Sequence, residues 1–229
     1  MLLSVVIPVF NEAKTVAALI EKVRAVALDK EIIIVNDGSS DGTREALAAY
    51  EKVDGVRVHH SPVNLGKGAS VRIGFSFARG DLVVIQDADL ELDPEEYHHL
   101  IKPILDGEAD VVFGSRFLGA GRRGSISFYI ANRALATLTN VLYGAHLTDI
   151  ETCYKVFRRD VVQSLKLRAS RFEIEPELTA QVLKHDYRLM ELPISYRPRT
   201  RDEGKKISWR DGITAVTTLI QQRLDGKSR

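Results

Sequence analysis

Three carboxylates follow an uninterrupted apolar run near the middle of the chain. The run covers residues 82–85, and Asp87, Asp89 and Glu91 come after it at alternating positions. A short apolar run is typical of a buried strand in a parallel sheet, and open α/β sheets bind ligands just beyond the carboxyl ends of their strands. Because positions i and i+2 of an extended chain point the same way, we expect Asp87 and Asp89 to share a face.

Two carboxylates on one face raise each other's pKa unless a cation lies between them. A hard divalent ion that prefers oxygen ligands, Mg²⁺ or Mn²⁺, is the natural partner. The alternative is a solvated turn at the end of a strand, which an isolated Asp-x-Asp pattern would favour. The rest of the chain has to decide between the two.

The N-terminal half alternates predicted strands and helices, the order of a mostly parallel α/β sheet. Strands are predicted at residues 3–8, 31–36, 56–60, 81–86 and 110–115, and helices at 14–27 and 66–79. Val16, Ile20, Val23 and Ala27 recur at helical spacing and are predicted to form the buried stripe of the first helix. Asp93 is placed to cap a helix that begins at Pro94.

The C-terminal half is less regular. Residues 129–143 are amphipathic, with Ile130, Ala134, Leu138, Val141 and Leu142 at helical spacing, which favours a core-facing helix over one lying on a membrane. Residues 153–157 read as a strand, a helix is predicted from Pro176 to about residue 185, and residues 188–196 are a candidate strand pair. A basic segment, residues 197–210, follows; it is either a charged loop or a mobile lid.

Composition and charge exclude several classes of protein. With 229 residues, 45% hydrophobic and 28% charged, the chain is long enough for one α/β domain, and a net charge of +1 gives no reason to expect a nucleic-acid partner. The single cysteine, Cys153, excludes an internal disulfide and fits a reducing compartment. We find no signal peptide and no apolar run near the ~20 residues that span a bilayer, so we expect a cytoplasmic protein.

Two common nucleotide motifs are absent. Gly66-Lys67 is followed by Gly68 and lacks the earlier glycine of a Walker loop, and the first strand ends in residues 8–12 without a glycine-rich fingerprint. The sequence therefore supports neither a phosphate-loop NTPase nor a dinucleotide-dependent dehydrogenase.

Four blocks of residues, in order and at matching spacing, carry a family resemblance. Residues 8–12 (PVFNE), 36–43 (NDGSSDGT), 64–68 (NLGKG) and 87–89 (DAD) resemble family 2 glycosyltransferases, which have the GT-A fold. Residues 114–117, 148–155, 172–177 and 204–209 resemble the branch that contains dolichyl-phosphate mannose synthase and bacterial polyprenyl-phosphate transferases. The resemblance implies an α/β GT-A domain over residues 1–229, with a nucleotide-sugar-binding half (1–118) and an acceptor-side half (119–229).

The resemblance also implies a function. It is the inverting, metal-dependent transfer of a hexose from GDP-mannose or a UDP-hexose to a polyprenyl phosphate, with Mg²⁺ or Mn²⁺ as cofactor. The protein would contact the cytoplasmic membrane face peripherally, through the region of residues 129–143, and could associate with a membrane-protein partner. The alternatives are transfer to a hydroxyl of a sugar or glycolipid, and a non-catalytic nucleotide-sugar-binding protein.

The resemblance assigns residues to the donor side. It places the nucleotide sugar against Pro8, Phe10, Glu12, Asp37, Gly38, Lys67, Asp87 and Ala88, and the metal against Asp87, Asp89 and Glu91. In the family the second aspartate of the pair binds the metal, a role that falls to Asp89, and Asp37 would bind the base. The alternative for Asp37 and Gly38 is a purely local role in their turn.

Basic residues are expected on the acceptor side, with Arg116 as the leading candidate. The acceptor phosphate is expected to meet Arg116, Arg122, Arg123, Arg199 and Lys205, with Lys155 as a further candidate. Asp149 or Glu151 could instead act as a general base toward a hydroxyl acceptor. For Arg116 the alternative is a surface arginine, and for Arg122 and Arg123 it is a solvated loop.

Overall fold

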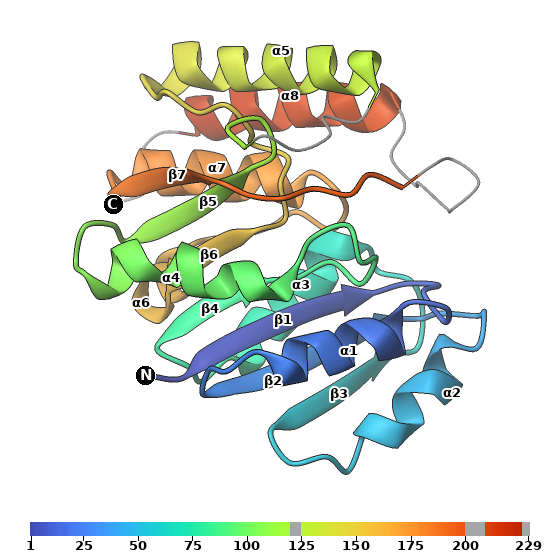
Figure 1. Ribbon diagram of the computed structural model, residues 1–229. Helices are drawn as coiled ribbons and strands as arrows, with labels where there is room; N and C mark the ends of the chain where they lie inside the picture. The colour runs from blue at the N-terminus through green and yellow to red at the C-terminus, as the bar shows by residue number, and fades with distance from the viewer. Residues whose placement is uncertain (120–124, 200–208, 226–229) are drawn as a thin grey trace.

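The computed structural model describes residues 1–119, 125–199 and 209–225. Arg122, Arg123 and Lys205, which we expected at the acceptor phosphate, lie outside the described residues. The described residues form one seven-stranded sheet with helices on both faces (Figure 1). Its strands are β1 (Leu3–Val9), β2 (Lys30–Asp37), β3 (Val56–Ser61), β4 (Leu82–Ile85), β5 (Val111–Ser115), β6 (Lys155–Arg158) and β7 (Leu189–Pro193).

The strand order is β3-β2-β1-β4-β6-β5-β7. Four of the pairings are parallel, and only β6, between β4 and β5, runs antiparallel to its neighbours. The expected mostly parallel α/β sheet is therefore confirmed. In β1, β2 and β4 every residue except Lys30, the first of β2, is buried. Burial of this kind is expected for continuous apolar runs that helices cover on both sides.

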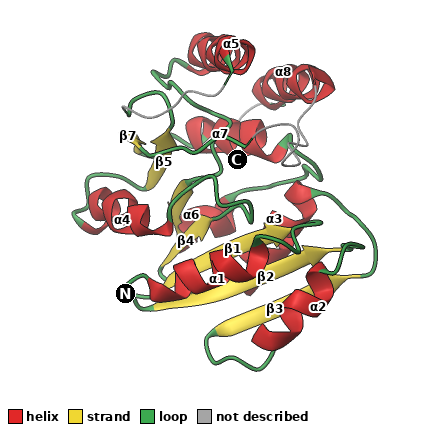
Figure 2. Cartoon of the chain, turned by 45° about the vertical axis from the view of Figure 1, so that its right-hand side comes forward, coloured by secondary structure: helices red, strands yellow, loops and turns green. Residues whose placement is uncertain are grey.

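Helices connect the strands and cover the sheet (Figure 2). They are α1 (Val16–Ala25), α2 (Thr43–Leu47), α3 (Lys67–Phe77), α4 (Tyr97–Leu105), α5 (Ile126–Tyr143), α6 (Arg159–Ser164), α7 (Ile174–Lys184) and α8 (Trp209–Leu224), with 3₁₀ turns at η1 (Ala48–Tyr50) and η2 (Pro94–Glu96). Asp93 caps η2 as expected, accepting a hydrogen bond from the Glu95 N–H. Helices α5 and α8 lie side by side at the end of the molecule beyond α7 (Figure 1).

Several predicted details are wrong. In α1 the buried side is Val16, Leu19, Ile20 and Val23, whereas Ala27 lies beyond the end of the helix and is exposed. The candidate strand pair at residues 188–196 is a single strand, β7, because its partner is β5. Helix α7 begins at Ile174, two residues before Pro176, and proline is tolerated there because the first helical N–H groups need no partner within the helix.

The predicted core-facing stripe of α5 is wrong in part, because Leu138 and Leu142 are half-buried and pack against the core, whereas Ile130, Ala134 and Val141 are exposed. Ile130 and Val141 are 60% and 78% exposed, and the buried side carries Asn132, Leu135 and Thr139. The helix turns a partly polar side inward because Asn132 donates a hydrogen bond to the buried Asp149. Ile126, Ile130 and Val141 of α5 are consequently left on the surface.

Candidate active site

A pocket of about 350 Å³ opens at the carboxyl ends of β1, β2 and β4. Its volume is in the range of pockets that bind small ligands. Of the expected donor-side residues it is lined by Pro8, Phe10, Glu12, Asp37, Lys67, Asp87, Ala88, Asp89 and Glu91, and of the acceptor-side residues by Arg116 and Arg199. Gly38, Asp149 and Lys155 are not part of the lining.

Asp37, the last residue of β2, anchors the loop that precedes α3. Its carboxylate accepts hydrogen bonds from the N–H groups of Leu65 (2.7 Å) and Gly66 (2.8 Å) and from the side chain of Asn64 (2.9 Å). These three bonds position Lys67, the first residue of α3, at the pocket. Asp37 therefore shapes the pocket as well as lining it.

Gly38 serves the turn after β2. Its φ is +66°, and a Cβ atom there would lie 2.5 Å from the carbonyl carbon of Val63. Gly42, in the same turn, has a φ of +94°, but a Cβ atom there would meet nothing closer than the Ala13 side chain at 3.9 Å. A side chain at either position would strain the backbone, but only one at Gly38 would also clash with neighbouring atoms.

We expect Gly38→Ala to destabilise the protein more than Gly42→Ala. Both changes add the left-handed strain, about 1–2 kcal/mol, and Gly38→Ala adds an overpacking cost of about 1–3 kcal/mol. Urea unfolding of the two variants and the unchanged protein measures the difference. Equal losses of unfolding free energy would show that the backbone near Val63 moves aside freely.

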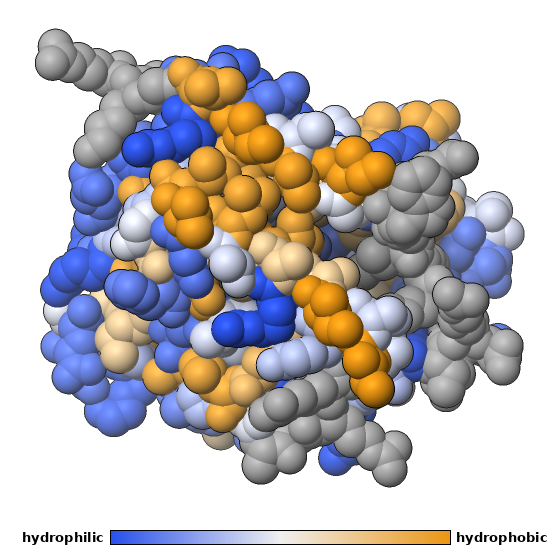
Figure 3. All heavy atoms as spheres, turned by 90° about the horizontal axis from the view of Figure 1, so that it is seen from above, coloured by the Kyte–Doolittle hydropathy of each residue, from blue (hydrophilic) through white to orange (hydrophobic). Residues whose placement is uncertain are grey.

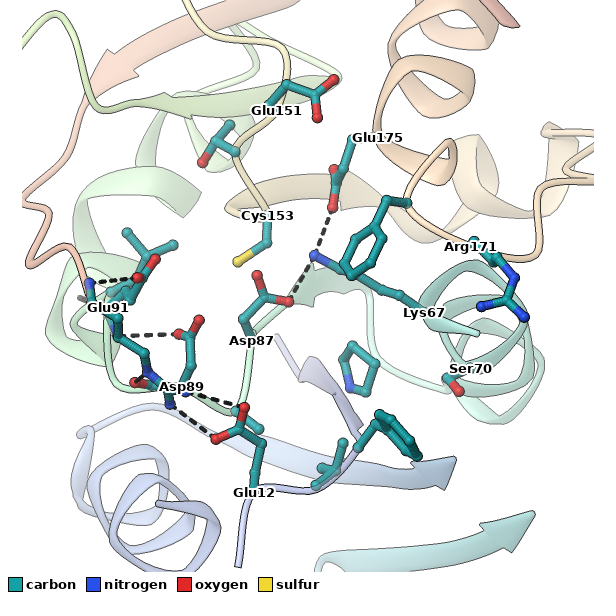
Figure 4. Close-up of a pocket in the computed structure, with 18 of the residues that line it drawn as sticks. Glu12, Lys67, Ser70, Asp87, Asp89, Glu91, Glu151, Cys153, Arg171 and Glu175 are labelled. Atoms are coloured by element: carbon teal, nitrogen blue, oxygen red, sulfur yellow. Dashed lines mark hydrogen bonds and ion pairs between the residues drawn. The ribbon is translucent and has the colours of Figure 1, made fainter. Parts of the chain in front are cut away.

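Lys67 bridges two carboxylates inside the pocket (Figure 4). Its Nζ lies 2.7 Å from Asp87 Oδ1 and 3.0 Å from Glu175 Oε1, a residue of α7. Burial lowers the pKa of Lys67, but the two carboxylates outweigh burial and raise it. Burial likewise opposes ionisation of Asp87, and the Lys67 ammonium holds the pKa of that carboxyl below its usual value. Asp87 is therefore an anion that already has an internal cation.

Asp89 lies in the opposite electrostatic situation. Its carboxyl accepts a hydrogen bond from the Glu91 N–H, and burial, followed by the charges of Asp87 and Glu91, raises its pKa to about 7. Glu91 accepts a hydrogen bond from the Arg199 N–H at 2.7 Å. In the described part of the chain, no three acidic, histidine or cysteine side chains are grouped so that they could hold a metal together. Asp87, Asp89 and Glu91 thus do not form a ready three-ligand cage.

Arg199 joins the C-terminal part of the chain to the donor side. Its guanidinium makes two hydrogen bonds to the Glu12 carboxylate, at 3.0 and 3.1 Å, and its Nε donates to the Asp89 carbonyl. The sequence placed Arg199 among residues for the acceptor phosphate, whereas the structure places it against Glu12 and the metal-binding candidates. Arg199 belongs to the basic segment at residues 197–210, of which the structure does not describe residues 200–208.

Arg116 lines the same pocket and is buried. Its Nε and Nη2 donate to the two oxygens of Asp149 at 2.7 and 2.8 Å, and its guanidinium lies 5.1 Å from the ring of Phe128 and 5.3 Å from that of Tyr196. Burial lowers the pKa of Arg116, and the Asp149 carboxylate outweighs burial and raises it. The alternative of a surface arginine does not describe this side chain.

Asp149 and Lys155 are both fully buried and have other partners. Asp149 holds Arg116, and Lys155 Nζ lies 2.5 Å from Glu175 Oε2 and donates to the carbonyl of Ile150. Neither side chain reaches the pocket in this structure. A role for Asp149 as general base, or for Lys155 as a phosphate ligand, would need a rearrangement.

Glu151 faces the pocket instead. Its Oε1 is buried and has no hydrogen-bond partner among the described residues. Burial, followed by the charge of Glu175, raises the pKa of Glu151 to about 7. Sequence reasoning named Glu151 only beside Asp149, because spacing alone cannot tell which of two nearby carboxylates turns inward.

The raised pKa of Glu151 predicts a pH-dependent stability. Because the folded-state pKa lies above the unfolded one, the protein with Glu151 loses stability as pH rises from about 4.5 to 7, relative to Glu151→Gln. We expect the free energy of unfolding of Glu151→Gln to be roughly 2–3 kcal/mol higher than that of the unchanged protein at pH 8, and about the same at pH 4. Urea unfolding at both values, with exposed Glu108→Gln as control, tests this. A constant difference between the two pH values would contradict it.

Other lining residues had no assigned role from the sequence. They are Val9, Asn64, Gly66, Ser70, Leu92, Phe128, Thr152, Cys153, Arg171, Phe172, Glu175 and Tyr196. Arg171, Phe172 and Glu175 come from the acceptor-side half and reach the donor side because the Gly68 and Ala69 N–H groups donate to the carbonyls of residues 171 and 170. The resemblance at residues 172–177 was the one signal for Phe172 and Glu175, and Arg171, just before that block, had none.

Comparison with protein families gives one match over most of the chain. The model described as "Glycosyl transferase family 2" matches residues 4–166. The "Low-salt glycan biosynthesis hexosyltransferase Agl6" of Haloferax volcanii is 32% identical over 95% of this chain. The "Polyprenol monophosphomannose synthase" of Mycolicibacterium smegmatis is 29% identical over 85% of this chain and 77% of its own length.

Some of these relatives are longer. The chain spans 53% of the Agl6 protein and 62% of the "Undecaprenyl-phosphate 4-deoxy-4-formamido-L-arabinose transferase" of Aeromonas hydrophila, which is 30% identical. Among solved structures, glucosyl-3-phosphoglycerate synthase from Mycobacterium tuberculosis, in complex with Mn²⁺, uridine diphosphate and phosphoglyceric acid, matches with a TM-score of 0.75 at 23% identity. The structural match covers 96% of this chain and 78% of the synthase chain, and it confirms the GT-A-type architecture.

Proposed function

Because the chain belongs to glycosyltransferase family 2, we propose that it transfers a hexose from a nucleotide sugar to a polyprenyl phosphate, with inversion at the anomeric carbon. One observation carries the choice of acceptor. The buried Arg116 lines the pocket next to Phe128 of α5, and that helix exposes Ile126, Ile130 and Val141 to the surface. Two of the relatives are named as polyprenol or undecaprenyl-phosphate sugar transferases.

The donor, GDP-mannose or a UDP-hexose, would occupy the end of the pocket between Asp37 and Asp89. Asp37 and the loop it anchors would bind the nucleoside, and Lys67 lies beside the expected place of the diphosphate. In this assignment residues 1–118 supply most of the donor side. Residues 119–229 supply the acceptor side. Three residues of this half, Arg171, Phe172 and Glu175, fold back to the donor side.

The donor set fits Mg²⁺ or Mn²⁺. Asp89 is a carboxyl whose ionisation is opposed by burial and by its acidic neighbours, so a bound cation would relieve an existing repulsion. Mg²⁺ binds through one or two carboxylates plus substrate phosphates, which fits Asp89 and Glu91 without Asp87. Such an ion supplies Lewis-acid neutralisation of the departing diphosphate.

The acceptor step needs no protein base. In the proposed transfer a phosphate oxygen of the acceptor bonds to the anomeric carbon as the bond from that carbon to the donor diphosphate breaks, and the nucleoside diphosphate leaves. A monoalkyl phosphate, with a second pKa near ~6, is already mostly dianionic at pH 7. Arg116 would hold that phosphate, oriented by Asp149 and enclosed by Phe128 and Tyr196.

The apolar face of α5 and α8 would bring the protein to the lipid (Figure 3). We define this face by its exposed residues, Ile126, Ile130 and Val141 of α5 and Ile213, Ile220 and Leu224 of α8. Exposed apolar patches on one side of a protein mark interaction sites, and amphipathic helices bind the boundary of a bilayer. Among the described residues, no helix has the length and apolar character to cross a membrane. From the exposed apolar face and the relatives named for lipid phosphates, we infer peripheral contact with the cytoplasmic membrane face, where a membrane protein could also bind.

We expect charges on the apolar face to weaken vesicle binding. The double variant Ile130→Asp, Val141→Asp should bind vesicles about 10–100-fold more weakly, since burying each isoleucine or valine contributes about 1.5–3 kcal/mol when complete. Flotation with vesicles containing polyprenyl phosphate measures this, and Leu105→Asp, an exposed leucine on α4, is the control. Equal binding by all three proteins would remove this face from the proposal.

A donor-by-acceptor screen tests the function itself. GDP-mannose and UDP-glucose are each offered with a short polyprenyl phosphate, the matching polyprenol and simple sugars, in Mg²⁺ or Mn²⁺. The expected product is an acid-labile sugar phosphate of inverted anomeric configuration. Transfer to polyprenol or sugars, with none to the phosphate, would overturn the assignment.

A hydroxyl acceptor is the second candidate, and Glu151 is the observation that favours it. A sugar hydroxyl needs a positioned base, and Glu151 is a carboxyl that lines the pocket with a buried oxygen lacking a partner among the described residues. The third alternative, a protein that binds nucleotide sugars without turnover, predicts donor binding and no product in every arm of the screen.

A further inference from the structure

Glu151 lies in the pocket with a carboxyl oxygen that lacks a partner. The loop carrying it runs along the pocket wall from Glu151 to Cys153, which lies beside Asp87 (Figure 4). A buried acceptor without a hydrogen bond costs about 1–3 kcal/mol, so such a group in a folded protein calls for an explanation. Neither the proposed metal nor the proposed phosphate contacts use Glu151.

The cations near Glu151 already have partners. Arg116 is paired with Asp149, Lys155 with Glu175, and Lys67 with both Asp87 and Glu175. When ionised, a carboxyl without a cation of its own repels phosphate, so neither the donor diphosphate nor the acceptor phosphate is favoured against it. The group that fits is a hydrogen-bond donor, and hydroxyl groups are the donors that a hexose presents.

The position of Glu151 suits the sugar part of the donor. Glu151 lies two positions before Cys153 in the chain, and two residues of chain span at most about 7 Å, a gap that one pyranose ring bridges. The diphosphate is expected at Asp89, on the Asp87 side of Cys153, and the attacking phosphate at Arg116. We expect the hexose between these groups. Glu151 and Glu175 lie on the same side of the pocket (Figure 4).

We propose that Glu151 binds a hydroxyl group of the transferred hexose and so selects the sugar of the donor; this rests on the proposed transferase function. The side chain discriminates by the hydroxyl it engages, because a deoxy sugar leaves the buried oxygen unsatisfied. Glu151 then contributes to binding the nucleotide sugar and contributes nothing to binding the nucleoside diphosphate alone.

Calorimetric titration of four ligands separates these contributions. The ligands are GDP-mannose, GDP, UDP-glucose and UDP, each with Mg²⁺, and the proteins are the unchanged chain, Glu151→Gln, Glu151→Leu and the control Glu108→Gln. We expect Glu151→Leu to bind the preferred nucleotide sugar at least tenfold more weakly and its nucleoside diphosphate within twofold. Glu151→Gln keeps an acceptor oxygen and should recover part of the loss.

Deoxy analogues of the preferred donor identify the hydroxyl. One of them should bind the unchanged protein as weakly as the parent sugar binds Glu151→Leu, and should show no further loss with that variant. Equal binding of the parent sugar by the unchanged protein and Glu151→Leu overturns the role of Glu151, as does an equal loss for sugar and diphosphate.

Two further outcomes separate this inference from the proposed function. If Glu151→Leu binds the donor normally but no longer transfers to a hydroxyl acceptor, Glu151 is a base and the inference is wrong. If the unchanged protein binds neither nucleotide sugar more tightly than its diphosphate and makes no product, the proposed function fails and the inference fails with it.

Discussion

Asp89→Ala is expected to remove divalent-dependent turnover, by a factor of at least about 100. Asp89 lines the pocket, and unlike Asp87 its carboxylate has no ammonium or guanidinium within ion-pair distance among the described residues. It is therefore the group best placed to gain from a metal ion. The variant should also bind the nucleotide sugar more weakly in Mn²⁺ and lose the increase that Mn²⁺ gives the unchanged protein.

A loss of folding would not explain this result. The pKa of Asp89 is raised in the folded state to about 7, so its charge destabilises the fold above that pH, and Asp89→Ala should be at least as stable as the unchanged protein at pH 8. Asp93→Ala is the matched control, because it removes the η2 cap and should lower stability by about 0.5–2 kcal/mol with little loss of metal response. Full activity of Asp89→Ala, or equal activity of the unchanged protein in excess EDTA, would contradict the metal assignment.

Arg116→Ala is expected to lower turnover more than donor affinity. Loss of a preorganised charge contact at the acceptor should cost about 2–4 kcal/mol of transition-state stabilisation, roughly a 30- to 1000-fold fall in kcat. The cation acts mainly when both substrates are present, since it holds the attacking phosphate against the donor diphosphate. Steady-state kinetics with polyprenyl phosphate, together with donor titration, separates the two effects.

The structure adds a cost that the sequence did not show. Removing Arg116 leaves Asp149 buried without its cation, which typically destabilises by about 3–5 kcal/mol. Arg116→Lys is the companion variant, because it keeps a cation for Asp149 while losing the two-point contact. Asp149→Asn should mimic part of the kinetic effect if Asp149 acts by orienting Arg116, and the double variant should then be less than additive. Unchanged turnover with weak donor binding would assign Arg116 to the nucleotide.

Much of the donor side was predictable from the sequence. Strands that run parallel end at the same edge of the sheet, so the residues that follow β1, β2 and β4 must lie together whatever the details of packing. Glu12, Asp37 and Asp87 accordingly line one pocket. The buried strands were predicted well because a run of apolar residues with helices on both sides has one stable place, the middle of a sheet.

The apolar side of α5 shows where the pattern is insufficient. Helical spacing groups Ile130 and Val141 with Leu138 and Leu142, but only the two leucines pack against the core. A protein core and a lipid bilayer are both apolar surroundings, and the pattern does not tell them apart. The structure decides it through Asn132, whose hydrogen bond to Asp149 turns the other side of the helix inward.

Sequence and resemblance together established the family, the mostly parallel sheet and the group of carboxylates at the end of β4. Only the tertiary structure decided which charges are free. Lys155 is taken by Glu175, Asp149 by Arg116 and Glu12 by Arg199, a pair 187 positions apart in the chain. Ion pairs over such separations depend on how loops fold back over the sheet. In a buried site, a charge that is already paired is no longer available to neutralise another neighbour. That is why Glu151, unremarkable in the sequence beside Asp149, lines the pocket with a buried oxygen that has no partner among the described residues.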